Sequence, residues 1–419
     1  ENILLAYRTI KRNGGSQTEG VDGVTIKDLE NLTQEDFISK VQRRFQYYRP
    51  RKVRRVEIPK PNGKKRPLGI PSMWDRVAQQ CILQVLEPIC EAKFYKHSYG
   101  FRPLRSADNA IMDCMYRMNK SHMTYVVDVD IKGFFDEVNH TKLMRQIWTL
   151  GIRDKQLLVI IRKMLKAPIV LPNGKVTYPT KGTPQGGILS PLLANINLNE
   201  FDWWISNQWE TFKSKHNYDF IRTKNGHKYI DKSNLYRALR TQNLKEIYIV
   251  RYADNFKIFC RNYKDAKKIY EASKKWLLER LGLEINESKS GITNLKRNSA
   301  EFLGFRSKAV PNKGKYTART SMSEKSKKNA IAKLNNQLTC IQKKPSSTEV
   351  FKLNSTILGL QNYYKRATMV TKDFADIAFI VERRLHNRFK KNITTIGTVS
   401  KNFQKLYPHW NTYKPIFLY

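Results

Sequence analysis

The sequence predicts an α+β protein of two or three domains, and three observations support this class. The chain has 419 residues, which is too long for one compact core. Two short apolar runs, Tyr248–Val250 and Phe256–Phe259, flank a tight turn and predict a β-hairpin. From residue 306 on, the chain is rich in lysine and its apolar residues follow helical spacing.

Helices and strands alternate in the first part of the chain. The spacing of apolar residues predicts helices over 1–13, 34–49, 72–94 and 104–120, and strands over 53–58 and 123–130. A glycine-rich turn covers 14–23, and a basic turn from Pro59 to Gly63 follows the first strand.

The second part begins with a loop, Lys181 to Gly187, and a helix that starts near Ser190 and Pro191, residue types typical of a helix start. Residues 207–244 are polar, basic and weakly periodic, which indicates an insertion. The remaining predicted elements are a helix over 265–281, a strand and turn over 301–305, and helices over 324–342, 347–366 and 372–391. Residues 306–419 hold 23 Lys+Arg against 5 Asp+Glu, and we expect this part to be helical.

The formal net charge of +41 implies a polyanionic partner, most simply nucleic acid. No stretch approaches the roughly 20 apolar residues that span a bilayer, so no membrane partner is expected. The five cysteines form no C-x-x-C pair, which argues against a zinc knuckle or a disulfide framework. We therefore expect a reduced, cytoplasmic protein that associates with nucleic acid.

Two aspartates are the strongest candidates for chemistry. Asp254 lies at the tip of the hairpin turn, and Asp130 ends the apolar strand Tyr125–Asp130. Acids on neighbouring strands can hold two Mg²⁺ ions, which can activate a 3′-hydroxyl and stabilise a pyrophosphate leaving group. Asp128 points to the same strand face as Asp130 and is the alternative ligand. Ile131, directly after Asp130, is also a candidate metal-binding residue.

Five further residues suit a nucleotide. The ring of Phe135 can block a ribose 2′-hydroxyl and so select deoxyribonucleotides, although a core phenylalanine is the alternative interpretation. Lys60 and Arg66 flank the basic turn, which can fold over a triphosphate. Gly186 allows the backbone to approach a nucleotide closely, and Gln185 can contact the incoming base pair or sugar. We expect Asp136 to cap the helix that follows.

Together these motifs resemble a known family, the reverse transcriptase/maturases encoded by bacterial and organellar group II introns. The resemblance extends from residue 1 to about residue 395. Its motifs stand in family order: Gly20–Gly23, Arg66–Pro71, Ser98–Pro103, the Asp130 strand, Gly182–Gly187 with Leu189–Asn195, Tyr252–Asn255 and Phe302–Phe305.

The resemblance implies a right-hand polymerase in which the fingers and palm contain antiparallel sheet. It implies an N-terminal extension over 1–35 that grips the template, and fingers and palm over 36–305 with an insertion at about 207–244. A helical thumb, or maturase X region, is implied over 306–419.

The resemblance also implies individual roles. In this family the first metal ligand lies five residues before the aromatic residue that gates the sugar, which fits Asp130 and Phe135. Lys60 and Arg66 match fingers residues that contact the nucleotide triphosphate. The primer grip corresponds to Phe302, Leu303 and Gly304.

One position departs from the family pattern. The hairpin in this family normally reads Tyr-Ala-Asp-Asp, whereas this chain has Asn255 at the second acidic position. Asparagine keeps the size of aspartate but lacks its charge. The candidate catalytic residues are therefore Asp130, Asp254 and Asn255, and we expect Asp254 still to hold magnesium while activity is weakened or lost.

The predicted function is that of an RNA-directed DNA polymerase. It would extend a DNA or RNA primer with dNTPs on an RNA template, and it would bind structured group II intron RNA to assist splicing and mobility. The alternatives are a non-catalytic splicing cofactor on a polymerase scaffold and a domesticated reverse transcriptase that serves defence or repair. The residues up to Tyr419 carry no cysteine-rich or His-Asn-His nuclease motif, so we expect DNA insertion to need an existing primer or nick.

Overall fold

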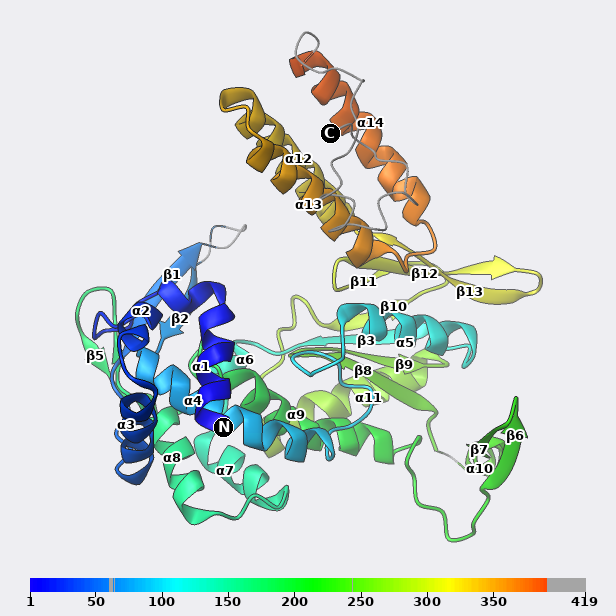
Figure 1. Cartoon of the computed structure of the whole chain (residues 1–419). Coiled ribbons are helices and arrows are strands. Elements are labelled where there is room, and N and C mark those ends of the chain that lie inside the picture. The colour runs from blue at the N-terminus through cyan, green and yellow to red at the C-terminus, as the bar shows by residue number, and fades with distance from the viewer. Residues whose placement is uncertain (60–62, 64, 243, 390–419) are drawn as a thin grey trace. The chain divides into compact units, whose positions relative to one another are not determined.

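The computed structural model describes residues 1–59, 63, 65–242 and 244–389 (Figure 1). The chain forms two compact units. The first comprises Glu1–Ser106 and Tyr125–Ile292, and the second comprises Ala107–Thr124 and the residues from Thr293 on. Both units contain helices and sheet, so the predicted α+β class is confirmed.

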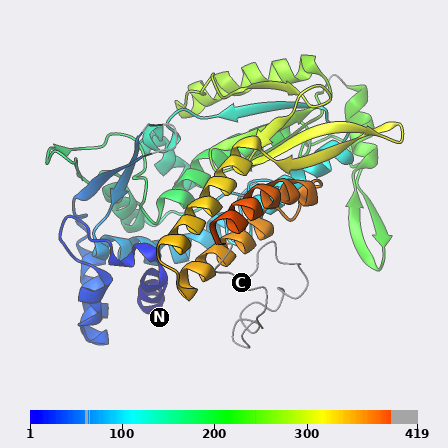
Figure 2. The ribbon, with the colours of Figure 1, turned by 90° about the horizontal axis from the view of Figure 1, so that it is seen from above.

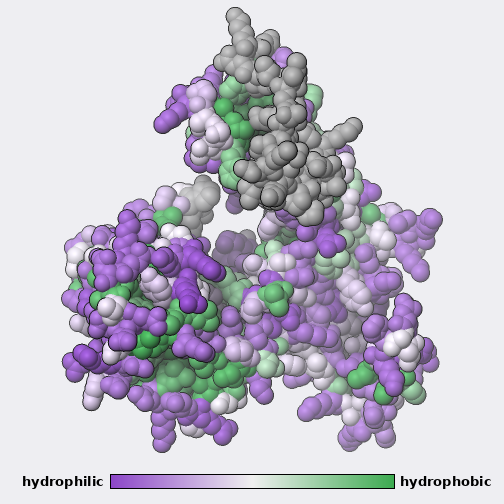
Figure 3. Space-filling model, viewed as in Figure 1, coloured by the Kyte–Doolittle hydropathy of each residue, from purple (hydrophilic) through white to green (hydrophobic). Residues whose placement is uncertain are grey.

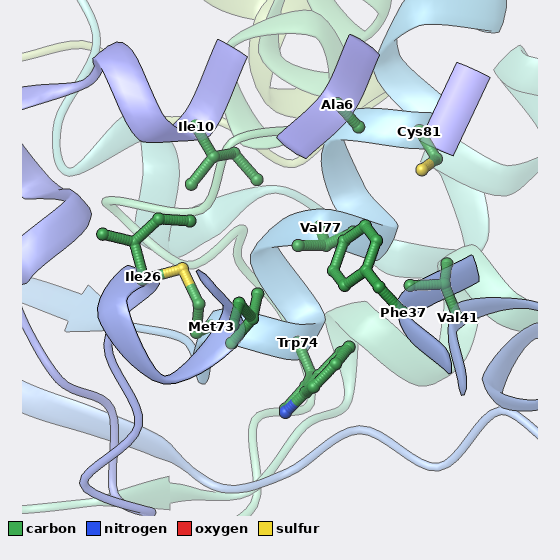
Figure 4. Packing of buried hydrophobic residues seen from close by; sticks show 10 residues of the cluster. Ala6, Ile10, Ile26, Phe37, Val41, Met73, Trp74, Val77 and Cys81 are labelled. Atoms are coloured by element: carbon green, nitrogen blue, oxygen red, sulfur yellow. The ribbon is translucent and has the colours of Figure 1, made fainter. Parts of the chain in front are cut away.

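The first unit begins with helices that pack around one apolar cluster (Figure 4). These helices are α1 (Asn2–Arg12), α2 (Ile26–Glu30), α3 (Gln34–Gln46) and α4 (Met73–Glu91), with a 3₁₀ turn at Gly14–Gln17. The hydroxyls of Thr33 and Ser72 cap α3 and α4, since each accepts a hydrogen bond from the amide three residues later. The cluster consists of Ala6, Ile10, Ile26, Leu29, Phe37, Val41, Met73, Trp74, Val77 and Cys81.

Two four-stranded sheets follow. One has the order β2-β1-β4-β5, with β1 (Val53–Pro59), β2 (Lys65–Ile70), β4 (Ile169–Val170) and β5 (Val176–Thr177). The other has the order β10-β3-β9-β8, with β3 (Tyr125–Asp130), β8 (Ile247–Tyr252), β9 (Asn255–Cys260) and β10 (Gly291–Asn294). The boundary between the two units falls within β10.

Further helices of the first unit are α6 (Phe134–Glu137), α7 (His140–Thr149), α8 (Lys155–Leu165), α9 (Ser190–Asn207) and α11 (Tyr263–Trp276), which continues into a π turn (Leu277–Leu281). Most side chains of α9 are buried, and the helix packs against β8. The expectation that Asp136 caps the next helix is wrong. Asp136 lies within α6, and the side chain of Asn139 caps α7 by accepting the Lys142 amide at 3.0 Å.

The segment that we interpreted as an insertion contains regular structure. It forms a two-stranded ribbon, β6 (Phe220–Lys224) and β7 (His227–Asp231), followed by α10 (Ser233–Thr241). The strands are joined by Asn225-Gly226, whose φ angles of 50° and 78° are both positive. Two-residue hairpin turns often require this geometry, and Asn-Gly is the sequence that favours it most.

The second unit contains α5 (Ala107–Asn119), a sheet of β11 (Ala300–Phe302), β12 (Phe305–Asn312) and β13 (Lys315–Met322), and the long helices α12 (Glu324–Lys343), α13 (Ser347–Tyr364) and α14 (Val370–Phe389). The three long helices lie side by side (Figure 2), and their bounds within the described residues agree with the predicted ones to within two residues. The last two residues of the third predicted helix, 390 and 391, lie outside the described residues. The expectation of an all-helical segment was wrong for the β12–β13 hairpin. There Phe305, Ser307 and Ala309 are buried while the intervening residues are more exposed, which is the alternation of a strand.

Among the described residues, no helix has the length and apolar character that crossing a bilayer requires.

Candidate functional site

The β8–β9 hairpin and the strand β3 bring the two predicted metal-binding aspartates together. Strand β9 lies between β3 and β8 and is antiparallel to both. Asn255 pairs with Asp130 on one side and with Tyr252 on the other, so the turn Ala253-Asp254 lies at the end of β3. Apolar β-branched and aromatic residues fill most buried positions of these strands, with Arg251 and Lys257 as buried charged exceptions, and Asp130 and Asp254 lie at the strand ends.

A distant segment holds the main chain of Asp130. Its amide donates to the hydroxyl of Ser290 at 3.1 Å, and its carbonyl accepts from the amide of Asn286 at 2.7 Å. The Lys289 ammonium lies 3.5 Å from the Asp130 carboxylate. Ile131 forms an isolated β-bridge with Ile285 and is buried, so only its main-chain oxygen could ever contact a metal.

The environment of Asp254 favours a cation. Burial raises the pKa of its carboxyl group, and the negative charge of Asp130 raises that pKa further, while Lys289 and Arg66 oppose the shift. Two adjacent carboxylates that repel each other are stabilised by a shared positive charge. The amide nitrogen of Asn255 lies 3.5 Å from a carboxylate oxygen of Asp254. Among the described residues, no cluster of three or more His, Cys, Asp or Glu forms a metal site.

Asp128, the alternative ligand, has a different partner. It lies opposite Lys257 in the β3–β9 register, and the ammonium of this buried lysine forms an ion pair with the Asp128 carboxylate. Breaking an ion pair whose lysine is buried is costly, so the Asp128 carboxylate is held beside Lys257 in the sheet.

A buried network lies beneath the Ala253-Asp254 turn. The guanidinium of Arg251 forms a two-pronged ion pair with Asp202 of α9, at 2.8 Å and 2.6 Å, and both side chains are almost fully buried. The same guanidinium donates to the carbonyl of Ala253 at 2.9 Å and to Asn195 at 3.0 Å. Ala253 has a positive φ of 56°, which a residue other than glycine adopts only at a cost, and this network supports it.

Gly100 forms the other support of the turn. A Cβ atom at this position would lie 2.3 Å from the Ala253 nitrogen, so a larger residue would displace the turn. The carbonyl of Gly100 accepts a hydrogen bond from Asn195 at 2.9 Å, which links it to the network of Arg251. Next to it, Tyr99 donates its amide to the carbonyl of Arg251 at 2.9 Å.

Two of the predicted nucleotide-binding residues, Arg66 and Gln185, are hydrogen-bonded to each other in the first unit. Arg66 on β2 donates to the side-chain oxygen of Gln185 at 3.2 Å, and Gln185 donates to Asp136 at 3.3 Å. The ring of Phe135 is half-buried and lies edge-on to Phe134, with centroids 5.4 Å apart. Lys60 lies outside the described residues.

Gly186 is required by its surroundings. Its φ is 107°, and a Cβ atom would lie 2.5 Å from the carbonyl oxygen of Gly69. The loop therefore stays flush against β2, where the amide of Gly69 also donates to the carbonyl of Gln185 at 2.5 Å. A cavity of about 160 Å³ lies beside this loop and is lined by Gly69, Asp136 and Gln185 among others.

The predicted primer-grip residues belong to the second unit. Phe302 is buried at the end of β11, and Leu303-Gly304 form a turn with φ angles of 51° and 79°. The hydroxyl of Tyr363 on α13 donates to the Leu303 carbonyl at 3.0 Å, so this helix fixes the turn.

Sequence reasoning did not identify the residues that position the aspartates. Asn286 and Ser290 carry no recognisable motif. The one available signal for Asp202 was an acid flanked by the apolar residues Phe201 and Trp203 within the helix Ser190–Asn207, where a buried carboxylate needs a cationic partner.

Comparisons with known proteins agree with this arrangement. The family model described as reverse transcriptase (RNA-dependent DNA polymerase) matches residues 58–307. Protein YkfC of Escherichia coli is 33% identical over 318 residues, which cover 73% of this chain and 80% of YkfC. The group II intron-encoded protein LtrA of Lactococcus lactis subsp. cremoris is 33% identical over 352 residues, which cover 75% of this chain and 57% of LtrA.

A putative COX1/OXI3 intron 2 protein of Saccharomyces cerevisiae is 31% identical over 331 residues, which cover 74% of this chain and 38% of that protein. The chain thus spans little more than half of LtrA and less than half of the yeast protein. The match includes the segments that carry Arg66, Asp130, Gln185 and Asp254. The chain belongs to the reverse transcriptase family, the RNA-directed DNA polymerases, and within it to the group II intron-encoded reverse transcriptase/maturases.

Proposed function

We propose that this chain extends the 3′ end of a DNA or RNA primer with deoxyribonucleotides on an RNA template, and that it binds structured intron RNA. The observation that carries the proposal is the position of Asp130 and Asp254 at one end of the β3-β9-β8 sheet. Both acids lie in the first unit, together with Arg66, Phe135 and Gln185.

Asp130 and Asp254 would hold two Mg²⁺ ions. Carboxylate oxygens suit this hard cation, which usually takes one or two carboxylates and completes its shell with water and substrate phosphates. When bound, the ions supply charge that activates the primer hydroxyl and stabilises the leaving pyrophosphate. Lys289, 3.5 Å from Asp130, offers a partial counter-charge to the carboxylates before any metal binds.

The row of Arg66, Gln185 and Asp136 would orient the incoming nucleotide. Arg66 is exposed and offers its guanidinium to phosphate, and Lys60 is assigned the same role from its place in the motif. Gly186 has no side chain, so the backbone beside Gln185 can approach the nucleotide closely. The half-buried ring of Phe135 would lie against the sugar and exclude a 2′-hydroxyl.

We also propose the division into a template-gripping extension (1–35), fingers and palm (36–305, with the insertion at about 207–244) and a thumb (306–419). Phe302, Leu303 and Gly304 would grip the primer. Their support is the strained turn that Tyr363 and the amide of Ser323 hold by hydrogen bonds at 3.0 Å and 2.8 Å.

A primer-extension assay with an RNA template, dNTPs and Mg²⁺ tests the proposal, and it compares this chain with its Asn255→Asp variant. We expect the variant to extend faster, because aspartate adds a charged oxygen ligand beside Asp254. Extension by the variant alone would identify Asn255 as an inactivating residue, and extension by both would mean that Asp130 and Asp254 suffice.

One observation favours a second function, a non-catalytic splicing cofactor. Asn255 is uncharged, whereas the family pattern has a charged aspartate at this position. Residues 306–419 nevertheless hold 23 Lys+Arg against 5 Asp+Glu. If neither protein extends a primer and both bind intron RNA tightly, the cofactor function replaces the polymerase function for this chain.

RNA binding should depend steeply on salt. A footprint that neutralises several phosphates releases counterions, so raising monovalent salt from about 50 to 200 mM should weaken binding about a thousandfold or more. Fluorescence anisotropy with labelled RNA at four salt concentrations measures the slope. A flat response would contradict an electrostatic footprint of the size that a net charge of +41 implies.

A further inference from the structure

The β6–β7 ribbon exposes apolar and aromatic side chains that the first unit does not use. All five residues of β6 and four of the five residues of β7 are exposed. Phe220, Ile221, Tyr229 and Ile230 keep 54%, 75%, 46% and 58% of their surface. A two-stranded ribbon has no core of its own in which to bury such residues. Exposed apolar residues gathered on one segment therefore indicate a surface that binds a partner. In Figure 3 the region around β6, β7 and α10 shows hydrophobic among hydrophilic residues.

The two faces of the ribbon differ in chemistry. Directly paired residues share a face, and faces alternate along each strand. Phe220, Arg222, Lys224, His227, Tyr229 and Asp231 therefore lie on one face, which we call the aromatic face. Ile221, Thr223, Lys228 and Ile230 lie on the other, the isoleucine face.

The aromatic face carries both rings and cations. Arg222 lies opposite Tyr229, and Lys224 lies opposite His227. Asp231 is the one acid on this face, and its carboxylate is already paired with Arg222 at 2.7 Å. Rings for stacking and cations for phosphates are the two components of surfaces that bind single-stranded nucleic acid.

The helix that follows the ribbon, α10, is packed against its surroundings. Tyr236 of α10 stacks on Trp209, with centroids 5.6 Å apart and an angle of 14° between the rings. Leu235 and Leu239 of α10 are buried, and so is Trp209. The ribbon therefore leads directly into a helix that is packed in the first unit.

We propose that the aromatic face of the β6–β7 ribbon binds unpaired RNA, with bases stacked on Phe220 and Tyr229 and phosphates near Arg222, Lys224 and His227. The inference rests on the proposed RNA-binding function and adds a surface outside the polymerase site. The net charge of +41 and the cations on the same face as the rings favour RNA over an apolar protein partner. A protein partner would instead favour the isoleucine face.

The test compares two double variants. Phe220→Val/Tyr229→Val removes both rings and keeps residues that favour strands, so the ribbon should persist. Ile221→Thr/Ile230→Thr is the matched control on the opposite face. The probe is a labelled, unstructured oligouridylate, measured by anisotropy with the polymerase site occupied by an unlabelled primer–template. Circular dichroism and thermal unfolding check that each variant is folded.

We expect the ring variant to bind the probe at least about 10-fold more weakly, because stacking contributes strongly for each base. We expect the control to bind like the parent chain. Lys224→Gln should weaken binding less and reduce its salt dependence. Equal binding by the ring variant and the parent, or a larger loss in the isoleucine-face control, would overturn the proposal.

Primer extension on a short primer–template separates this inference from the proposed function. We expect the ring variant, in the Asn255→Asp background, to extend at the parent rate. If no protein extends the primer but the rings still determine probe binding, the polymerase proposal fails and the RNA surface stands. If extension occurs and the rings do not affect probe binding, the polymerase proposal stands and the proposed RNA surface fails.

Discussion

Replacing Asp254 by asparagine is expected to reduce primer extension by about three orders of magnitude or more, in both the Asn255 and the Asn255→Asp backgrounds. The substitution keeps the shape of the side chain and removes the charge that would hold the metal. Losing several kcal/mol of transition-state stabilisation corresponds to such a factor. Single-turnover extension on an RNA template measures the effect, and Asp130→Asn should give a loss of the same order.

The unfolding temperature of the Asp254→Asn variant provides an independent check on this prediction. Because burial raises the pKa of Asp254, its ionised form is less favourable in the folded chain than in the unfolded chain at neutral pH. Asparagine should therefore leave the unfolding temperature unchanged or higher. A matched control is Glu271→Gln, which removes an exposed carboxylate from α11 and should leave extension unchanged. Near-normal extension by Asp254→Asn would remove Asp254 from the proposed metal site.

Breaking the Arg251–Asp202 pair is expected to have the second largest effect. Arg251→Met leaves the buried carboxylate of Asp202 without its partner, which should cost about 3–5 kcal/mol of unfolding free energy. It also removes the hydrogen bond to the Ala253 carbonyl, and a shift of the turn by about 1 Å can reduce the rate about 100-fold. Chemical denaturation and primer-extension kinetics measure the two effects separately.

A double variant separates positioning from stability. Arg251→Met/Asp202→Leu removes both charges, which should recover most of the lost stability because apolar replacements of a buried pair are tolerated. Its rate should stay low with little change in the KM for dNTP, since the Ala253 carbonyl has lost its donor. Arg366→Met, which breaks the exposed pair with Asp108, is the control and should cost less than about 1 kcal/mol. If the double variant extends primers at the parent rate, Arg251 stabilises the fold but does not position the Ala253-Asp254 turn for catalysis.

The local parts of the fold could be predicted from the sequence. Helical periodicity located α12, α13 and the start of α14 to within two residues, and the apolar runs located β3 and the β8–β9 hairpin. Asn225-Gly226 between exposed strands is a hairpin signal that the polar composition of 207–244 obscured. The β12–β13 hairpin was missed because its lysines and arginines stand at the exposed positions of an alternating strand, where composition alone does not distinguish strand from helix.

In the candidate site, too, some residues could be predicted from the sequence and others could not. Asp130, Asp254, Arg66, Phe135 and Gln185 stand in short motifs, and the structure brings Arg66 and Gln185 into contact and places Asp130 beside the turn that holds Asp254. Their supports could not be predicted, because Asp202, Asn286 and Ser290 act through pairings between distant parts of the chain. Nothing local in the sequence distinguishes a serine that holds a strand end from one on the surface.

The hydrogen bonds that link Asn286 and Ser290 to the main chain of Asp130 also have a consequence for the synthesis of the chain. Asp130 and Ser290 are separated by 160 positions, so the ribosome must synthesise the whole intervening segment before the end of β3 can be fixed. Contacts between such distant positions form late, because a long loop must close first. The nascent chain therefore passes through a period in which its apolar strands exist without their partners. During that period it is exposed to misassembly, and chaperones or early binding of RNA would protect it.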